Sequence, residues 1–90
     1  MKTAEREHIG RVKLLPCSCC GEPGPSDAHH IRDGQGLAQR SPHWLVIALC
    51  KSCHQGKNGV HGDKTMMRIM KMGELDMLAK TIERLAYNVS

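Results

Sequence analysis

The sequence predicts a small α+β domain that is held together by a zinc ion. The chain has 90 residues, two Cys-x-x-Cys pairs and a core poor in aromatic side chains, with no Phe, one Trp and one Tyr. A domain of this size buries only just enough apolar surface to fold alone. A structural zinc ion would add roughly 10–16 kcal/mol of binding free energy that is coupled to folding. We therefore expect a single zinc-containing domain over residues 1–90.

The first third of the chain is predicted to contain one helix, a turn-rich segment and a short strand. Thr3 is a suitable N-cap for a helix over residues 4–14, and Pro16 ends this helix. Residues 16–36 include four glycines and three prolines, which indicate turns around a first metal-binding loop. A short strand is expected in this segment, over residues 28–31.

The middle of the chain predicts a second strand and a short helix. Residues 45–49 form a short apolar run rich in β-branched side chains, so we expect a buried strand that leads into the second cysteine pair. A helix should begin at Ser52. Gly56 and Gly59 limit it to about two turns, because glycine disfavours a helix interior.

Two more helices are expected toward the C-terminus. Asp63 can cap a helix that extends to Met72, with Gly73 as its C-terminal stop. Residues 74–89 have the clearest helical periodicity, because apolar and charged positions fall on opposite faces. The apolar face predicted for this last helix comprises Leu75, Leu78, Ile82, Leu85 and Val89.

Positive charge is concentrated in one part of the chain. Thirteen Lys and Arg against nine Asp and Glu give a formal net charge of +4. Between Asp33 and Asp63 there is no acidic residue. A surface of one charge sign beside a metal site is typical of proteins that bind a polyanion. The candidate nucleic-acid-binding residues in and next to this stretch are Arg32, Arg40, Lys51 and Lys57.

The sequence argues against secretion and against a membrane span. The N-terminal segment is charged and has no apolar core, so we expect no secretory signal. No apolar run approaches the roughly 20 residues that a membrane-spanning helix needs. We therefore expect a cytosolic protein with no membrane partner. Thiols stay reduced there, so Cys-x-x-Cys pairs indicate metal binding rather than disulfides.

The two cysteine pairs are the predicted ligands of a structural Zn²⁺ ion. Cys17 and Cys20 form the first pair, and Cys50 and Cys53 form the second. Four thiolates in two pairs make a closed tetrahedral zinc site. Cys19 would replace Cys17 or Cys20 only by closing a strained ring, so we interpret it as a spare thiol.

The histidines suggest a second site with a different task. His29 and His30 are adjacent on a predicted strand, so their side chains should point to opposite faces. One of them can bind a metal while the other takes a proton from water. His54 directly follows the second cysteine pair, and Asn58 lies one helical turn further on the same face. His61 lies almost two turns after His54 and would share this face if the helix continued, but Gly59 between them disfavours a continuous helix.

The motif order resembles that of a known enzyme family. Cys-x-x-Cys, then His-His-Ile, then Leu-Cys-x-x-Cys-His is similar to the zinc-stapled HNH, or ββα-metal, endonucleases. It resembles most closely the small phage and prophage nucleases of the recombination-enhancement (Ref) type. The matching segments, which extend over most of the chain, are Thr3-Ala-Glu5, Leu15-Pro-Cys17, His29-His30-Ile31, Leu49-Cys50 with Cys53 and His54, and Glu74-Leu-Asp-Met-Leu-Ala79. The resemblance implies a ββα-metal (HNH) core with flanking N- and C-terminal helices.

The resemblance also implies roles for the individual residues. His30 would be the general base that activates water, and His29 and His54 would bind a catalytic divalent ion, Mg²⁺ or another. Asn58 or His61 would complete the ligand set. The metal would stabilise charge on the phosphate and on the leaving oxygen. The implied partners are DNA as substrate and a recombinase filament of the host that presents the DNA.

The sequence departs from the family pattern at the middle residue of the motif. The Asn that usually orients the base should lie a few residues before Cys50, yet residues 43–48 read His-Trp-Leu-Val-Ile-Ala. His43, a backbone carbonyl or Asp27 would have to orient His30 instead.

Two hypotheses about function therefore remain. The first is a metal-dependent DNA endonuclease, and the second is a non-catalytic zinc module that binds nucleic acid. The position of the His-His pair between the two cysteine pairs favours the enzyme.

Overall fold

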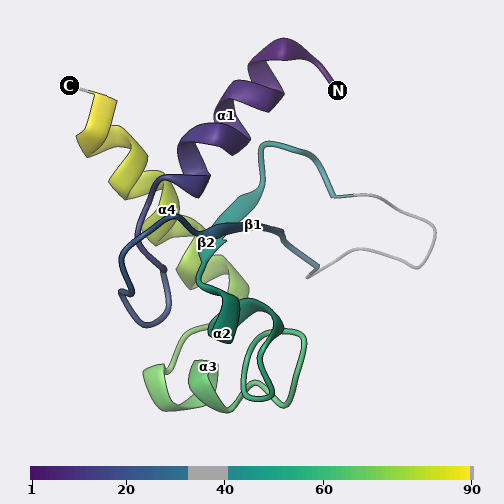
Figure 1. The fold of residues 1–90 in the computed structure, drawn as a ribbon, viewed down its shortest axis with the longest axis vertical. Coiled ribbons are helices and arrows are strands. Elements are labelled where there is room, and N and C mark those ends of the chain that lie inside the picture. Colours follow the sequence, from purple (N-terminus) through teal and green to yellow (C-terminus); the bar gives the residue numbers. More distant parts are fainter. Residues whose placement is uncertain (33–40, 90) are drawn as a thin grey trace.

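The computed structural model describes residues 1–32 and 41–89, and these residues form four helices and a two-stranded sheet (Figure 1). The predicted α+β class is therefore confirmed. In chain order the elements are α1 (Thr3–Lys13), β1 (Asp27–His30), β2 (Val46–Leu49), α2 (Lys51–Gln55), α3 (Thr65–Met70) and α4 (Glu74–Val89).

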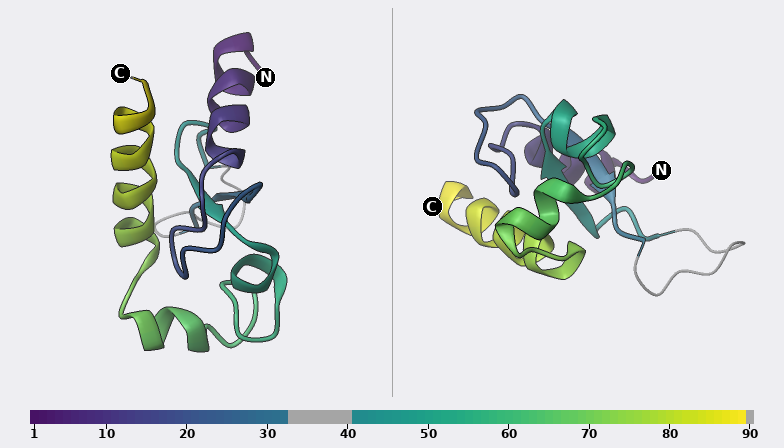
Figure 2. Two further views of the ribbon diagram at one scale, coloured as in Figure 1. Left: turned by 60° about the vertical axis from the view of Figure 1, so that its left-hand side comes forward. Right: turned by 90° about the horizontal axis from the view of Figure 1, so that it is seen from below.

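The sheet lies between two long helices and a pair of short ones. Strands β1 and β2 run antiparallel, with Asp27 opposite Leu49 and His30 opposite Val46. Helices α1 and α4 lie side by side and pack against the sheet, whereas α2 and α3 occupy the other end of the molecule (Figures 1 and 2). Because Asp27 pairs with Leu49, the start of β1 lies next to the start of α2, and the candidate sites are found there.

Strand β2 contributes to both parts of the hydrophobic core. Its four residues are all buried. Because successive side chains of a strand point to opposite faces, Ile47 and Leu49 join one cluster while Val46 and Ala48 join the other. The first cluster also contains buried cysteines and residues of α3 and α4, and the second contains residues of α1 and the chain that follows it. A single short strand thus connects both helical layers.

Helix α1 begins one residue earlier than predicted. Lys2, in an extended conformation, is the N-cap, so the prediction of Thr3 as the cap is wrong. The backbone N–H of Lys2 donates to Glu5 Oε1 at 2.7 Å. The side chain of Glu5, at the third helical position, thus accepts a backbone hydrogen bond at the start of the helix, and no Thr hydroxyl is needed there. Both predicted strands are found, each one residue away from an expected boundary.

Helix α3 is shorter than predicted. Lys64 is its N-cap and adopts a left-handed conformation, with φ of 61°. Asp63, one residue before the N-cap, still stabilises the start of the helix, because its Oδ1 accepts hydrogen bonds from the N–H and the hydroxyl of Thr65 at 2.9 and 2.6 Å. The helix ends at Met70, and its C-cap Lys71 is also left-handed, so the predicted stop at Gly73 is wrong. A left-handed lysine is energetically unfavourable, so the sequence gives no sign that the helix stops before Lys71 and predicts a longer helix.

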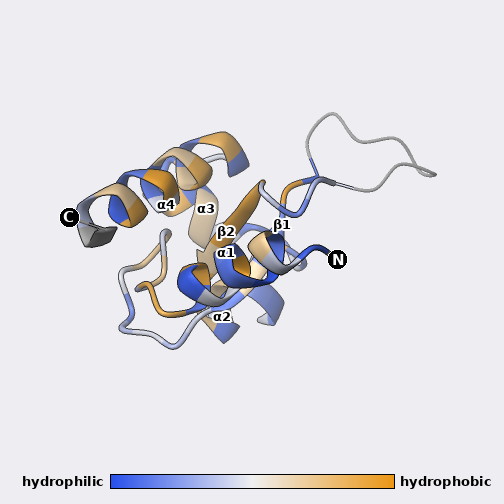
Figure 3. Cartoon of the chain, turned by 90° about the horizontal axis from the view of Figure 1, so that it is seen from above, coloured by the Kyte–Doolittle hydropathy of each residue, from blue (hydrophilic) through white to orange (hydrophobic). Residues whose placement is uncertain are grey.

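Helix α4 has the predicted bounds, but only part of the predicted apolar face, Leu78 and Leu85, packs against the core. Leu75 and Ile82, which were expected to face the core, are 62% and 51% exposed. Leu78 is buried as predicted, and Met77 and Thr81 are fully buried. Apolar and polar segments both occur along α4 (Figure 3), and the buried side coincides only in part with the apolar face that the periodicity defines. Neither α4 nor any other helix in the described part of the chain is long and apolar enough to cross a membrane.

A buried hydroxyl group explains why Thr81 faces the core. Thr81 Oγ1 donates to the carbonyl of Met77 at 2.9 Å. It lies 2.7 Å from Ser18 Oγ and accepts from the N–H of Ala48 at 3.3 Å. The N–H of Ser18 in turn donates to the carbonyl of Ala48 at 2.8 Å. These bonds tie α4 to the open edge of β2 and to the loop that carries the first cysteine pair.

Candidate metal centres

The four predicted zinc ligands lie together. The sulfur atoms of Cys17, Cys20, Cys50 and Cys53 are all within 4.8 Å of one another. Cys20 Sγ and Cys50 Sγ are 3.6 Å apart. Four sulfurs about 2.3 Å from one tetrahedral zinc would be separated by roughly 3.8 Å. The cluster is therefore compact enough to hold a metal ion such as zinc.

Separate elements hold the two cysteine pairs in this position. The first pair sits in a tight turn that Gly21 closes, with φ of 83° and its N–H donating to the carbonyl of Cys17 at 3.0 Å. Arg84 of α4 donates to the same carbonyl at 3.2 Å. In the second pair, Cys50 is the N-cap of α2 and Cys53 lies within this helix. The cluster therefore connects the N-terminal half of the chain to α2.

The environment of the cluster favours the thiolate of Cys17. Burial by itself would raise the pKa of Cys17, but hydrogen bonds from the backbone at Cys20, Cys50 and Cys19 lower it to about 7. Burial raises the pKa of Cys53 and of Cys20. Four adjacent thiols of this kind would ionise together only beside a cation, because like charges repel. This donor set fits a zinc ion.

The fifth cysteine belongs to the core rather than to the cluster. Cys19 is buried among apolar residues that include Ile47 and Leu49. Its sulfur is not among the four mutually close sulfur atoms, and burial raises its pKa. These observations agree with its interpretation as a spare thiol.

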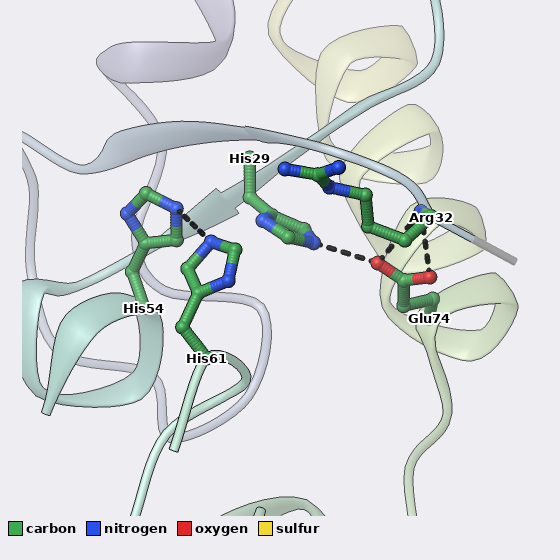
Figure 4. Close-up of polar contacts among 5 residues, drawn as sticks. All are labelled: His29, Arg32, His54, His61 and Glu74. Carbon is green, nitrogen blue, oxygen red and sulfur yellow. Dashed lines mark hydrogen bonds and ion pairs between the residues drawn. The ribbon is translucent and has the colours of Figure 1, made fainter. Parts of the chain in front are cut away.

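Three histidines form a second cluster. His29 comes from β1, His54 from α2, and His61 from the loop after α2; their candidate ligand atoms lie within 4.8 Å of one another (Figure 4). His54 Nε2 and His61 Nε2 are 3.2 Å apart. Nitrogen atoms bound to one metal ion at about 2.0–2.1 Å would be separated by roughly 3.0–3.4 Å. The three imidazoles can therefore hold a metal ion.

A close backbone approach brings His61 to this cluster. After α2 the chain folds back, and the N–H of Val60 donates to the carbonyl of Cys53 at 2.7 Å. A Cβ atom on Gly59 would lie only 2.5 Å from the same carbonyl oxygen, so this position requires glycine. The N–H of His61 then reaches the carbonyl of His54 at 3.3 Å. Gly59, which weakened the expected helix, is thus the residue that permits the return of the chain.

The structure brings His61, and not Asn58, to the other two histidines. The side-chain amide of Asn58 lies 3.2 and 3.3 Å from the carboxylate oxygens of Asp63. The carbonyl of Asn58 accepts from the N–H of Met66 at 3.0 Å. Asn58 therefore supports the start of α3, and of the two residues predicted for the third ligand position only His61 faces the cluster.

Two carboxylates contact the histidine cluster. His29 Nε2 lies 2.6 Å from Glu74 Oε2, and His54 Nδ1 lies 3.1 Å from Asp27 Oδ2. The hydrogen bond with His54 lowers the pKa of Asp27. The sequence does not single out Glu74 as a site residue, because 45 residues separate it from His29 and no local pattern connects them.

His30 lies apart from this cluster and contacts His43. His30 Nε2 and His43 Nδ1 are 3.1 Å apart. Of the groups predicted to orient His30, Asp27 instead contacts His54, so His43 is the side chain that holds this ring. Burial lowers the pKa of His30, and His43 and Arg32 lower it further. His30 is therefore neutral at physiological pH and able to accept a proton.

Two of the predicted basic residues, Arg32 and Lys51, lie close to the histidine cluster. Arg32, Lys51 and Lys57 are exposed, and the side chain of Arg32 extends beside His29 (Figure 4). Burial lowers the pKa of His61, and the charges of His54 and Arg32 add to this effect. The predicted residue Arg40 lies outside the described residues.

Known proteins supply no further assignment for these two centres. Comparisons of the chain with protein-family models, with curated proteins and with solved structures found no match. The chemistry of the two centres must therefore be inferred from their residues and geometry.

Proposed function

We propose that this protein is a metal-dependent DNA endonuclease of the HNH type that hydrolyses phosphodiester bonds. The observation that carries the proposal is the convergence of His29, His54 and His61 from three separate segments. Small domains commonly rely on one structural metal, and the cysteine cluster supplies that site. A second cluster of imidazoles, with carboxylates behind two of them, is the arrangement of a metal centre that does chemistry.

The ligand set indicates the class of the second metal. Imidazole nitrogens suit zinc and other transition metals, whereas Mg²⁺ and Ca²⁺ prefer oxygen ligands. We therefore expect Zn²⁺, Mn²⁺, Co²⁺ or Ni²⁺ to bind at the histidines more tightly than Mg²⁺. When bound, such an ion would supply a Lewis acid that stabilises charge on the phosphate and on the leaving oxygen.

His30 is the residue proposed to take a proton from the attacking water. Its lowered pKa keeps the ring neutral at physiological pH, which a general base requires. The contact with His43 at 3.1 Å orients the ring, in place of the Asn that the HNH resemblance leads one to expect. Arg32, Lys51 and Lys57 would attract the phosphate backbone of DNA. A recombinase filament that presents the DNA is the partner implied by the resemblance.

A non-catalytic zinc module that binds nucleic acid is the second candidate. The cysteine cluster and the basic residues would suit such a module equally well. It would have no use for three clustered histidines with carboxylate partners, and this difference favours the enzyme.

Plasmid nicking combined with metal analysis tests the proposal. The zinc-loaded protein should bind a second metal ion and nick supercoiled plasmid, either bare or coated with recombinase. His30→Ala should retain both metals and lose cleavage by a factor on the order of 10²–10⁴. His54→Ala should lose only the second metal, because the adjacent Cys53 still binds zinc.

A third variant controls for the loss of any histidine. His8→Ala should behave like the wild type, because the His8 ring contacts the Trp44 carbonyl at 3.0 Å rather than either cluster. Undiminished nicking by His30→Ala would reject the general-base role. One metal per chain, with no nicking of either substrate by the wild type, would favour the binding module.

A further inference from the structure

The two carboxylates behind the histidine cluster touch different ring nitrogens. Glu74 contacts Nε2 of His29, whereas Asp27 contacts Nδ1 of His54. A carboxylate only accepts hydrogen bonds, so the nitrogen that faces it carries the hydrogen. A neutral imidazole has a single N–H, and the opposite nitrogen keeps its lone pair. The contacts therefore select opposite tautomers in the two rings.

The contact between Glu74 and His29 is the more constrained of the two. The side chains are only 10% and 2% exposed, respectively. The backbone N–H of Arg32 donates to both Glu74 oxygens, at 2.8 and 3.1 Å. These two bonds also identify the Glu74 oxygens as acceptors. By contrast, Asp27 is 29% exposed and lies within 4.0 Å of Lys51 as well.

The nitrogens left with lone pairs converge on one point. With Nε2 of His29 directed to Glu74, the ring turns Nδ1 toward His54 and His61 (Figure 4). With Nδ1 of His54 directed to Asp27, Nε2 remains, and this atom lies 3.2 Å from Nε2 of His61. Each carboxylate thus stands behind its histidine, on the side away from the cluster.

We propose that Glu74 is a positioning residue of the histidine metal site, which holds His29 as the Nε2–H tautomer and presents Nδ1 to the ion. Asp27 does the same for His54 with the two nitrogens exchanged. The proposal rests on the metal site of the proposed function. A carboxylate behind a histidine ligand orients the ring and increases its basicity, and its loss typically costs 10–100-fold in metal affinity.

The tautomers can be measured directly in the wild-type protein. Long-range ¹H–¹⁵N spectra of the protein, with zinc only in the cysteine site, should show His29 protonated on Nε2 and His54 protonated on Nδ1. A His29 ring protonated on Nδ1 would overturn the proposal, whatever the variants do.

Metal affinity tests the consequence for binding. Calorimetric titration of the zinc-loaded protein with Mn²⁺ should give a 10–100-fold weaker second site in Glu74→Ala. Glu74→Gln should fall between this variant and the wild type, because an amide oxygen still accepts a hydrogen bond but carries no charge. An affinity of Glu74→Ala within twofold of the wild type would overturn the proposal.

Asp76→Asn is the matched control. Asp76 lies in the same first turn of α4 and accepts from the N–H of Gly73 at 2.9 Å, without contacting a histidine. Its replacement removes the same charge from the helix terminus and should leave the Mn²⁺ affinity within twofold of the wild type. An equal loss in Asp76→Asn would assign the effect to helix electrostatics and overturn the role of Glu74.

Neither measurement involves DNA, so the two proposals can fail separately. Correct tautomers and a weaker Mn²⁺ site in Glu74→Ala, together with a wild type that does not nick DNA, would reject the nuclease alone. Nicking by the wild type, with the Mn²⁺ affinity unchanged in Glu74→Ala, would reject the positioning role alone.

Discussion

Replacing Thr81 with valine would remove the hydroxyl that joins α4 to the loop of the first cysteine pair while keeping nearly the same shape. Thr81 and Ser18 are 0% exposed, as is Ala48. In Thr81→Val, the hydroxyl of Ser18 loses its partner at 2.7 Å and the N–H of Ala48 loses its partner at 3.3 Å. Water cannot replace these bonds, because all three residues are inaccessible to solvent.

The expected loss of stability follows from these two orphaned groups. A buried donor without a partner costs about 1–3 kcal/mol. The contact with Ala48 is long and should contribute at the low end of this range. We therefore expect Thr81→Val to lower the free energy of unfolding by about 2–4 kcal/mol, a large fraction of the roughly 5–15 kcal/mol typical of a domain.

Urea denaturation followed by circular dichroism, at a fixed excess of zinc, measures this loss. The slope of the free energy against urea concentration should not change, because the same surface is exposed on unfolding. Thr3→Val is the matched control on the exposed start of α1 and should change stability by no more than about 0.5 kcal/mol. The double variant Ser18→Ala/Thr81→Val should be more stable than additivity predicts, because the hydroxyl that lost its partner is also removed. Additive losses, or a stable Thr81→Val protein, would refute the reasoning.

Three further predictions concern zinc, DNA and pH. Cys50→Ser should lose zinc and unfold while Cys19→Ser keeps both zinc and fold, as metal analysis and circular dichroism would reveal; a folded, zinc-free Cys50→Ser protein would contradict this. DNA affinity measured by fluorescence anisotropy should fall steeply with salt, and Lys57→Gln should weaken binding to all sequences about equally, whereas a salt-independent affinity would exclude this mode. The nicking rate should fall as the pH drops through the His30 pKa, which burial and His43 place below 6.5, because only the neutral base is active. His43→Ala should move this inflection upward toward 6.5, and a downward shift would contradict the assignment.

The cysteine cluster could be predicted because its information is local. Each Cys-x-x-Cys pair forms its own turn, and only the meeting of the two turns depends on the rest of the fold. The bounds of α4 were likewise visible, since Gly73 precedes a long helical pattern that starts with Glu74. Such features depend on neighbouring residues and on backbone preferences, which a sequence displays directly.

The parts that could not be predicted depend on contacts between distant segments. Thr81 faces the core because Ser18 offers a hydroxyl partner from the other end of the chain, and hydropathy assigns no such preference to threonine. His61 reaches its neighbours because Gly59 lets two backbone segments touch, whereas helical periodicity treats the same glycine only as an interruption. The contact of Glu74 with His29 joins α4 to the end of β1. In each case tertiary packing decides the outcome.

Because α4 is one continuous helix, it sets the spacing and the relative rotation of two centres that share no ligand. Glu74 contacts His29 at one end of the helix, and seven positions later Thr81 contacts Ser18 in the loop of the first cysteine pair. Seven residues are almost two full turns, so the two side chains leave the helix on the same side, about 10 Å apart. One alanine inserted between them would rotate Glu74 by about 100° relative to Thr81 and shift it by about 1.5 Å. The cysteine centre would remain assembled, while His29 would lose its carboxylate partner.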